Sequence, residues 1–105
     1  MTNHTAALTA LADPTRRAIF ERLARSPSAV GELARELPVS RPAVSQHLKV
    51  LKSAGLVTDQ AAGTRRVYSV DSAGIAAIRG YFEQFWQQSL ASFRTAAGQP
   101  VQEET

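Results

Sequence analysis

The side chains best suited to chemistry in this sequence lie close together, between Ser40 and Lys49. Ser45 and Gln46 can donate and accept hydrogen bonds, and Arg41 and Lys49 carry positive charges. Hydroxyl, amide and guanidinium groups of this kind complement the edges of bases and the phosphate oxygens beside them. The segment is therefore a candidate for binding nucleic acid.

A helix preceded by a turn would place these groups on one face. Pro38 ends an earlier helix, because the residue before a proline is driven out of the α region. Ser40 can then cap the next helix, Pro42 is tolerated in its first turn, and Gly55 supplies a left-handed stop. We therefore predict a helix-turn-helix whose second helix is the recognition helix.

The spacing within this helix separates an inward from an outward side. The apolar stripe at steps of three and four residues contains Val44, His47, Leu48 and Leu51. The outward side contains Ser40, Arg41, Pro42, Ser45, Gln46 and Lys49, which are the predicted DNA-binding residues of this element. On this pattern His47 is a packed core histidine, and a base-reading or pH-sensing role is the weaker alternative.

A β-hairpin is predicted to follow the recognition helix. Residues 56–60 and 65–70 are rich in β-prone side chains and flank a turn at 61–64. Because an isolated hairpin is marginally stable, it must pack on the helices as the wing of a winged helix. The tip carries Arg65 and Arg66, whose guanidinium groups suit phosphates or a narrow minor groove. The alternative is an edge strand that its charges protect from pairing.

The start of the chain predicts two further helices. The polar residues through Thr5 are expected to fray, with His4 solvated. A short alanine-rich helix with Leu8 and Leu11 follows, and it has too little apolar surface to stand alone. Asp13 and the proline after it open the next helix as N-cap and first helical residue.

The last helix is predicted from about residue 73 to 97, after a cap at Asp71 and Ser72, and Gly74 and Gly80 should weaken it locally. Its apolar positions are Ile75, Ile78, Phe82, Phe85, Trp86, Leu90 and Phe93. A domain of this size has little left to cover them, so we predict a two-fold dimer. The predicted dimerisation residues are Leu8, Leu11, Phe82, Phe85, Trp86, Leu90 and Phe93. Burial against the chain's own core is the alternative, and residues 98–105 are expected to be disordered.

Length and composition limit the protein to a single domain spanning residues 1–105. The fold class expected is mainly α with a small β-hairpin, a winged helix-turn-helix of about five helices plus a two-stranded wing. Residues 14–66 contain ten Lys and Arg against four Asp and Glu, a net charge of +6, whereas the remainder carries −3. Positive charge is thus concentrated around the predicted recognition element, as a polyanionic partner requires.

Several classes of function lack the residues they need. The chain has no cysteine, which excludes disulfides, cysteine-based zinc sites and thiol switches. No nucleophile–base arrangement and no glycine-rich phosphate loop can be placed, so enzyme activity is not expected. No apolar run approaches the roughly 18 residues of a membrane span, and the start lacks the basic residues of a secretory signal. We expect a cytoplasmic protein without a membrane partner.

Residues 12–17, 30–34, 40–51 and 54–57 together resemble the ArsR family of bacterial winged-helix repressors, and the similarity covers about residues 8 to 93. The resemblance implies a homodimer that binds an operator and blocks transcription. It also implies that the start of the second helix lies near the DNA backbone, so that Arg16 or Arg17 is expected to touch phosphate, with plain surface arginines as the alternative. Relatives often carry a capping Ser or Thr where this chain has Ala29, so Ser28 is expected to cap the third helix instead.

Metal-sensing relatives place a cysteine at the position of Ala29, and His and carboxylate ligands near the residues that match Ser72, Ala73 and Gly74. None of these side chains in this sequence matches the family's ligands, so the resemblance stops short of metal sensing. No metal and no cofactor are expected.

The leading hypothesis is a homodimeric, metal-independent repressor that binds a palindromic operator in double-stranded DNA. A second hypothesis keeps the fold but uses it as a protein-interaction module without specific DNA binding. A third is a repressor released by an organic effector held between Phe82, Phe85 and Trp86 of the dimer.

Overall fold

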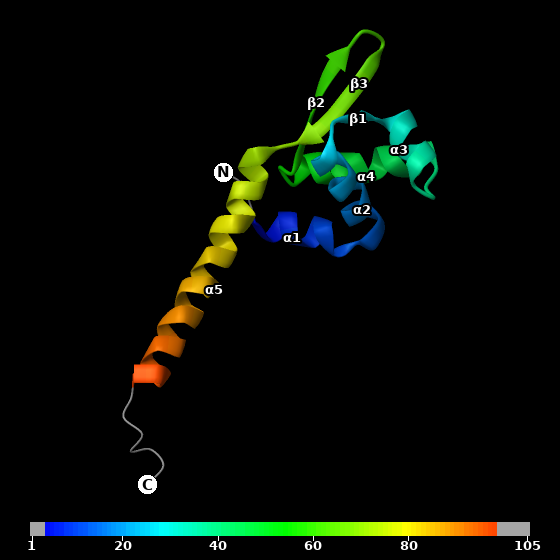
Figure 1. Ribbon diagram of the computed structural model, residues 1–105. Helices are drawn as coiled ribbons and strands as arrows, with labels where there is room; N and C mark the ends of the chain where they lie inside the picture. The colour runs from blue at the N-terminus through cyan, green and yellow to red at the C-terminus, as the bar shows by residue number, and fades with distance from the viewer. Residues whose placement is uncertain (1–3, 99–105) are drawn as a thin grey trace.

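The computed structural model describes residues 4–98, which form five helices and a three-stranded sheet (Figure 1). The elements in chain order are α1 (His4–Ala12), α2 (Pro14–Arg25), β1 (Ser28–Ala29), α3 (Val30–Glu36), α4 (Arg41–Ser53), β2 (Val57–Ala62), β3 (Arg65–Val70) and α5 (Ser72–Gly98). The predicted fold class, a mainly helical winged helix-turn-helix, is confirmed. The fraying and disorder predicted for the two ends are wrong for His4, Thr5 and Gly98, which are helical, and otherwise fall outside the described residues.

A small apolar core joins the first four helices to the base of the hairpin. Leu33 of α3 and Leu48 and Leu51 of α4 are fully buried, together with Ile19 of α2. Half-buried Phe20, Val30 and Ile78 are among the side chains that pack around them. The apolar stripe predicted for α4 is therefore confirmed at Val44, Leu48 and Leu51. His47 was predicted to be packed in the core, but it is less buried than that prediction requires. It is half-buried, unlike the other residues of the stripe.

The helix ends follow the predicted chemistry at three places. The Asp13 carboxylate accepts a hydrogen bond from the Arg16 backbone N–H at 2.8 Å, which lowers the pKa of Asp13. The Ser40 hydroxyl accepts from the Ala43 backbone N–H at 3.3 Å and caps α4. Gly55 has φ +79°, a left-handed conformation that glycine adopts without strain, and it follows the end of α4.

The start of α3 differs from the prediction. Ser28 is not its cap but a buried residue of strand β1. Instead, Oε1 of Glu32 accepts hydrogen bonds from the Ala29 backbone N–H at 2.9 Å and from the Ser28 hydroxyl at 3.1 Å. These two donors are the main reason why the pKa of Glu32 lies below its ordinary value. α3 therefore begins with a first-turn carboxylate bonded to the backbone N–H of its N-cap residue Ala29, and not with a serine cap.

The sheet contains one strand more than predicted, in the order β1-β3-β2. β1 pairs antiparallel with β3, with Ala29 opposite Val67, and so ties the wing to the start of α3. β2 continues through Ala62, so the connection is the two residues Gly63 and Thr64 rather than the predicted 61–64. Gly63 has φ +65°, which a two-residue hairpin connection demands. Two residues were too short a strand for the sequence pattern to indicate.

The C-terminal helix α5 leaves the helical body and extends well beyond it (Figure 1). Gly74 lies where α5 starts, and a Cβ atom added there would come 2.1 Å from the Gly55 carbonyl oxygen. Gly74 therefore permits a close approach of α5 to the end of α4, which corrects the prediction that it only weakens the helix. The prediction of a solvated His4 is also wrong, since its ring stacks on Tyr81 with centroids 4.2 Å apart. None of the described helices is long and apolar enough to cross a membrane.

Candidate nucleic-acid interface

The outward side of α4 presents the groups that the sequence pattern assigned to it. All six predicted residues of this side are exposed: Ser40, Arg41, Pro42, Ser45, Gln46 and Lys49. Their exposure follows from the buried stripe, because the side of the helix opposite the buried Val44 and Leu48 must face outward. An amide, two hydroxyl groups and two cations therefore lie on one accessible helical surface, as direct contact with bases and phosphates requires.

The two wing arginines sit beside the turn but lie on opposite faces of the hairpin, because neighbouring strand residues alternate. Arg65 forms an ion pair with Glu32 of α3 at 2.9 Å, and Arg66 forms one with Asp59 of β2 at 3.0 Å. Lys52 at the end of α4 reaches the same Asp59 at 2.7 Å. The sequence predicted the position of both arginines and missed both carboxylate partners.

The electrostatics around Asp59 fix the wing to α4. The Lys52 ammonium group, and after it the Arg66 guanidinium group, hold the pKa of Asp59 below its ordinary value. The Asp59 side chain is only 9% exposed, whereas those of Lys52 and Arg66 are more than half exposed. The carboxylate is thus enclosed by its two cationic partners, and the cations keep surface available for other contacts.

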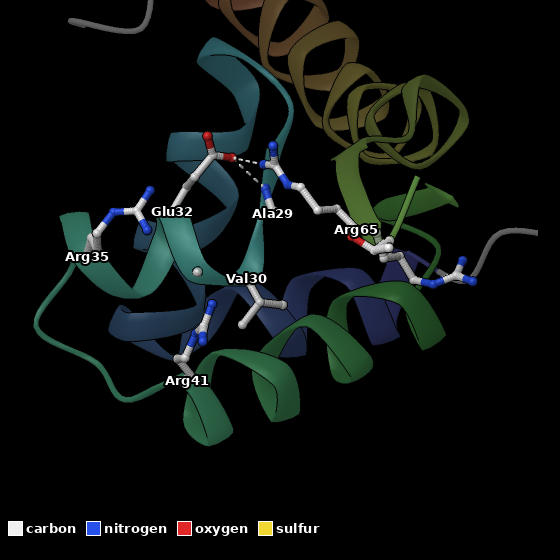
Figure 2. Close-up of a pocket in the computed structure, with 9 residues that line it drawn as sticks. Ala29, Val30, Glu32, Arg35, Arg41 and Arg65 are labelled. Carbon is white, nitrogen blue, oxygen red and sulfur yellow. Dashed lines mark hydrogen bonds and ion pairs between the residues drawn. The ribbon is translucent and has the colours of Figure 1, made fainter. Parts of the chain in front are cut away.

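A hollow of about 480 Å³ lies between the wing, the start of α3 and the first turn of α4. Figure 2 shows Arg35, Arg41 and Arg65 reaching it from α3, α4 and β3 respectively. The Arg41 guanidinium group lies over Gly31, where an added Cβ would come only 2.3 Å from its Nη2 atom. Arg35 was not among the predicted site residues, because three residues so far apart in sequence gave no shared spacing to detect.

Arg16 and Arg17, the arginines that the resemblance placed near DNA, are turned toward α1. Nη1 of Arg16 donates to the Ala10 carbonyl at 3.1 Å, and Nη1 of Arg17 donates to the Leu11 carbonyl at 3.1 Å. Arg16 is half-buried and its Nε is enclosed without a hydrogen-bond partner in the described part of the chain. A phosphate contact by Arg16, which was predicted, would have to use terminal N–H groups other than the one that is bonded to the Ala10 carbonyl.

A second surface, on α5, is apolar. Phe82, Phe85, Trp86 and Phe93 are exposed by 53%, 47%, 59% and 71% respectively. The alternative that these rings are buried in the chain's own core is therefore wrong. Leu90, and Leu8 and Leu11 of α1, are half-buried. Because the three rings proposed to hold an organic effector are exposed, one protomer does not by itself enclose a cavity with them.

Metal ligands do not gather in the described residues. Within residues 4–98, no three His, Cys, Asp or Glu side chains lie close enough together to hold a metal ion. The described acids Asp13, Glu32, Glu36 and Asp59 instead act as helix caps or ion-pair partners.

Comparisons with known proteins agree with this architecture. A family model described as a helix-turn-helix domain matches residues 11–60. The chain is 67% identical over 84 residues to the HTH-type transcriptional regulator Rv2034 of Mycobacterium tuberculosis (strain ATCC 25618 / H37Rv), covering 80% of this chain and 78% of that protein.

Two solved structures extend the likeness to three dimensions. An ArsR-like transcriptional regulator from Rhodococcus sp. RHA1 gives a TM-score of 0.75 at 31% identity, covering 90% of this chain and 92% of that one. The homodimeric winged helix-turn-helix DNA-binding domain of Mb0332 from Mycobacterium bovis gives 0.65 at 27% identity, covering 80% and 78%. On this evidence the chain belongs to the ArsR family of winged helix-turn-helix transcriptional regulators, which are DNA-binding proteins rather than enzymes.

Proposed function

We propose that the protein is a homodimeric, metal-independent repressor that binds a near-palindromic operator and acts in the bacterial cytoplasm. The observation that carries the proposal is the exposed polar side of α4, which presents Ser45 and Gln46 to solvent between Arg41 and Lys49. Gln46 is the residue best suited to reading a base, because a side-chain amide can form two hydrogen bonds with adenine in the major groove.

A dimer supplies the two-fold symmetry that a palindromic site requires. The exposed rings of Phe82, Phe85 and Trp86 lie three and four residues apart on α5, and a homodimeric relative shares the fold. Pairing through α5 and α1 would bury these rings in an isologous interface. The two recognition helices would then enter successive major grooves, about 34–36 Å apart along the duplex.

The metal independence that we propose is supported by the residues that stand where relatives carry ligands. Ala29 has no ligating atom and lies buried in β1, and Ser72 to Gly74 offer only one side-chain hydroxyl among them. An operator affinity that changes after chelation, or on adding zinc at matched ionic strength, would contradict this part of the proposal.

The test begins with selection of bound fragments from a random duplex pool at a stated salt concentration. We expect a near-palindromic consensus with half-sites about one helical turn apart. Gln46→Ala should then weaken binding to the selected operator by about 1–3 kcal/mol while leaving binding to a scrambled duplex nearly unchanged. Equal losses on both duplexes would remove Gln46 from base recognition. A failure of the wild type to prefer any sequence would favour the protein-interaction hypothesis.

A further inference from the structure

The hollow between the wing, α3 and the first turn of α4 is a concentrated positive site. Arg35, Arg41 and Arg65 line it from three different elements, and Glu32 is the acidic residue among its lining. Arg66 lines it as well, so with these five side chains ionised the lining carries a net charge of +3, and Arg66 is paired with Asp59 outside the lining. At about 480 Å³ it has room for one phosphate group and several waters, since a water occupies about 30 Å³ in the liquid.

Arg35, Arg41 and Arg65 differ in whether they form an ion pair within the protein. Arg65 is paired with Glu32, whereas Arg35 and Arg41 make no hydrogen bond or ion pair with any side chain of residues 4–98. Arg41 is nevertheless held in place, because its guanidinium group rests on the open side of Gly31. Two guanidinium groups that form no ion pair within the described residues therefore line a space that one anion could fill.

We propose that this hollow binds one backbone phosphodiester of the operator, and that Glu32 competes with that phosphate for Arg65. The inference rests on the proposed function, since it assumes that α4 enters the major groove and the wing flanks the neighbouring minor groove. One sugar–phosphate strand separates those two grooves. A duplex seated on both elements must pass this strand over the space between them, which the three arginines line from three separate elements (Figure 2).

Glu32 has a second task that makes the competition testable. Its Oε1 atom accepts from the Ala29 backbone N–H, the Ser28 hydroxyl and Arg65 at 2.9, 3.1 and 2.9 Å. A glutamine at this position keeps an oxygen acceptor for the start of α3 and removes the negative charge. Glu32→Gln should therefore leave the fold intact, free Arg65 and make DNA binding tighter.

The experiment measures affinity for the selected operator duplex across a salt series, with each variant paired to a control of the same charge change. Arg35→Gln and Arg41→Gln are paired with Arg25→Gln, an exposed arginine at the end of α2 that does not line the hollow. Glu32→Gln is paired with Glu36→Gln, whose carboxylate binds Arg22 at 2.6 Å instead. Circular dichroism melting of every variant verifies the fold.

We expect Arg35→Gln and Arg41→Gln each to reduce the salt slope by about 0.9 per lost phosphate contact, or about twice that in a dimer, with no change in Arg25→Gln. We expect Glu32→Gln to bind about two- to fivefold more tightly, the range of an exposed ion pair, and Glu36→Gln to bind like the wild type. The proposal fails if the arginine variants match Arg25→Gln, or if Glu32→Gln binds no more tightly than Glu36→Gln.

A free anion could have the same chemistry as a backbone phosphate, and inorganic phosphate distinguishes the two. At constant ionic strength, exchanging chloride for phosphate should leave the operator affinity of the wild type unchanged. Binding of inorganic phosphate to the DNA-free wild type that is lost in Arg41→Gln, together with an operator affinity of Arg41→Gln equal to that of Arg25→Gln, would assign the hollow to a free anion and overturn the proposal. These results are separate from a failure of the repressor assignment, in which the wild type itself would show no preference for the selected operator.

Discussion

Helices α4 and α5 are both amphipathic, yet a single protomer buries the apolar side of only one of them. The apolar stripe of α4 is covered by the same protomer, with Val44, Leu48 and Leu51 fully buried. The aromatic part of the apolar stripe of α5 stays uncovered, with Trp86 exposed by 59% and Phe93 by 71%. The comparison shows that an apolar stripe locates a buried contact without saying which chain supplies the partner.

Because of this difference, the two helices offer different surfaces for contact with a partner. In α4 the buried stripe orients the opposite, polar side, which is the side we propose contacts DNA. In α5 the polar side is ordinary solvated surface, and the apolar side is the one left to make a contact. Substitutions on the two stripes should therefore be separable by what they disturb, the folding of a protomer for α4 and its association for α5.

The largest effect is expected from removing the aromatic surface of α5. Replacing Phe85 and Trp86 together by alanine should weaken self-association by about 100-fold or more, because large central aromatics dominate interfaces. Sedimentation over a range of protein concentrations measures it, and the secondary structure of the protomer by circular dichroism should stay unchanged. An unaltered dimer would place the interface elsewhere and break the contrast with α4.

The next effect compares two apolar residues within α4. Leu48→Ala should lower the free energy of unfolding by about 2–5 kcal/mol, because Leu48 is fully buried and its truncation leaves a cavity. Val50 on the same helix is 40% exposed, and Val50→Ala should change the stability by no more than about 0.5 kcal/mol. Urea denaturation at one fixed protein concentration measures both. Similar losses would mean that the packing of α4 depends on the assembly.

Two glycines of α5 test the junction between the helices. Gly74→Ala should destabilise the protein by about 1–3 kcal/mol, because the new methyl group meets the Gly55 carbonyl oxygen. Gly80 has no heavy atom of the described residues within 4 Å of such a methyl group, so Gly80→Ala should stabilise α5 by up to about 1 kcal/mol through helix propensity. The melting temperatures of the two variants should shift in opposite directions, down for Gly74→Ala and up for Gly80→Ala. A stabilising Gly74→Ala would show that the close approach is not needed.

The smallest effect concerns how the free energy of unfolding falls as the solution becomes acidic. Because Lys52 and Arg66 lower the pKa of Asp59 in the folded protein, its contribution is present at neutral pH and is lost as the pH falls from the ordinary aspartate value toward the depressed one. Asp59→Asn should therefore show a shallower loss of stability between pH 7 and pH 3 than the wild type. Urea midpoints across this range measure it, and parallel curves for the two proteins would contradict the linkage.

Elements with a strong local signal could be predicted from the sequence. Asp13 and Ser40 are polar caps that begin helices, Gly55 ends one, and the spacing of Val44, Leu48 and Leu51 fixes the face that α4 buries. Each of these signals depends on residues within about two helical turns of one another, a range over which spacing and turn chemistry apply directly.

The features that were missed depend on residues distant in sequence. β1 exists because Ser28 and Ala29 find a partner in β3, almost forty positions later. The pairing of Glu32 with Arg65 and the stack of His4 on Tyr81 likewise join separate elements. Gly74 looked like a weak point in a helix because nothing near it in sequence indicates that Gly55 lies against it.

The sequence by itself therefore determined where α2 and α4 start and where α4 stops, which side of α4 faces outward, and that α5 carries more apolar surface than a small domain can cover. Only the tertiary structure decided that the wing arginines point to opposite faces and that Arg35, Arg41 and Arg65 meet at one hollow. The reason is physical: short-range periodicity sets the direction of a side chain on its own element, whereas the packing of elements on one another sets which side chains meet.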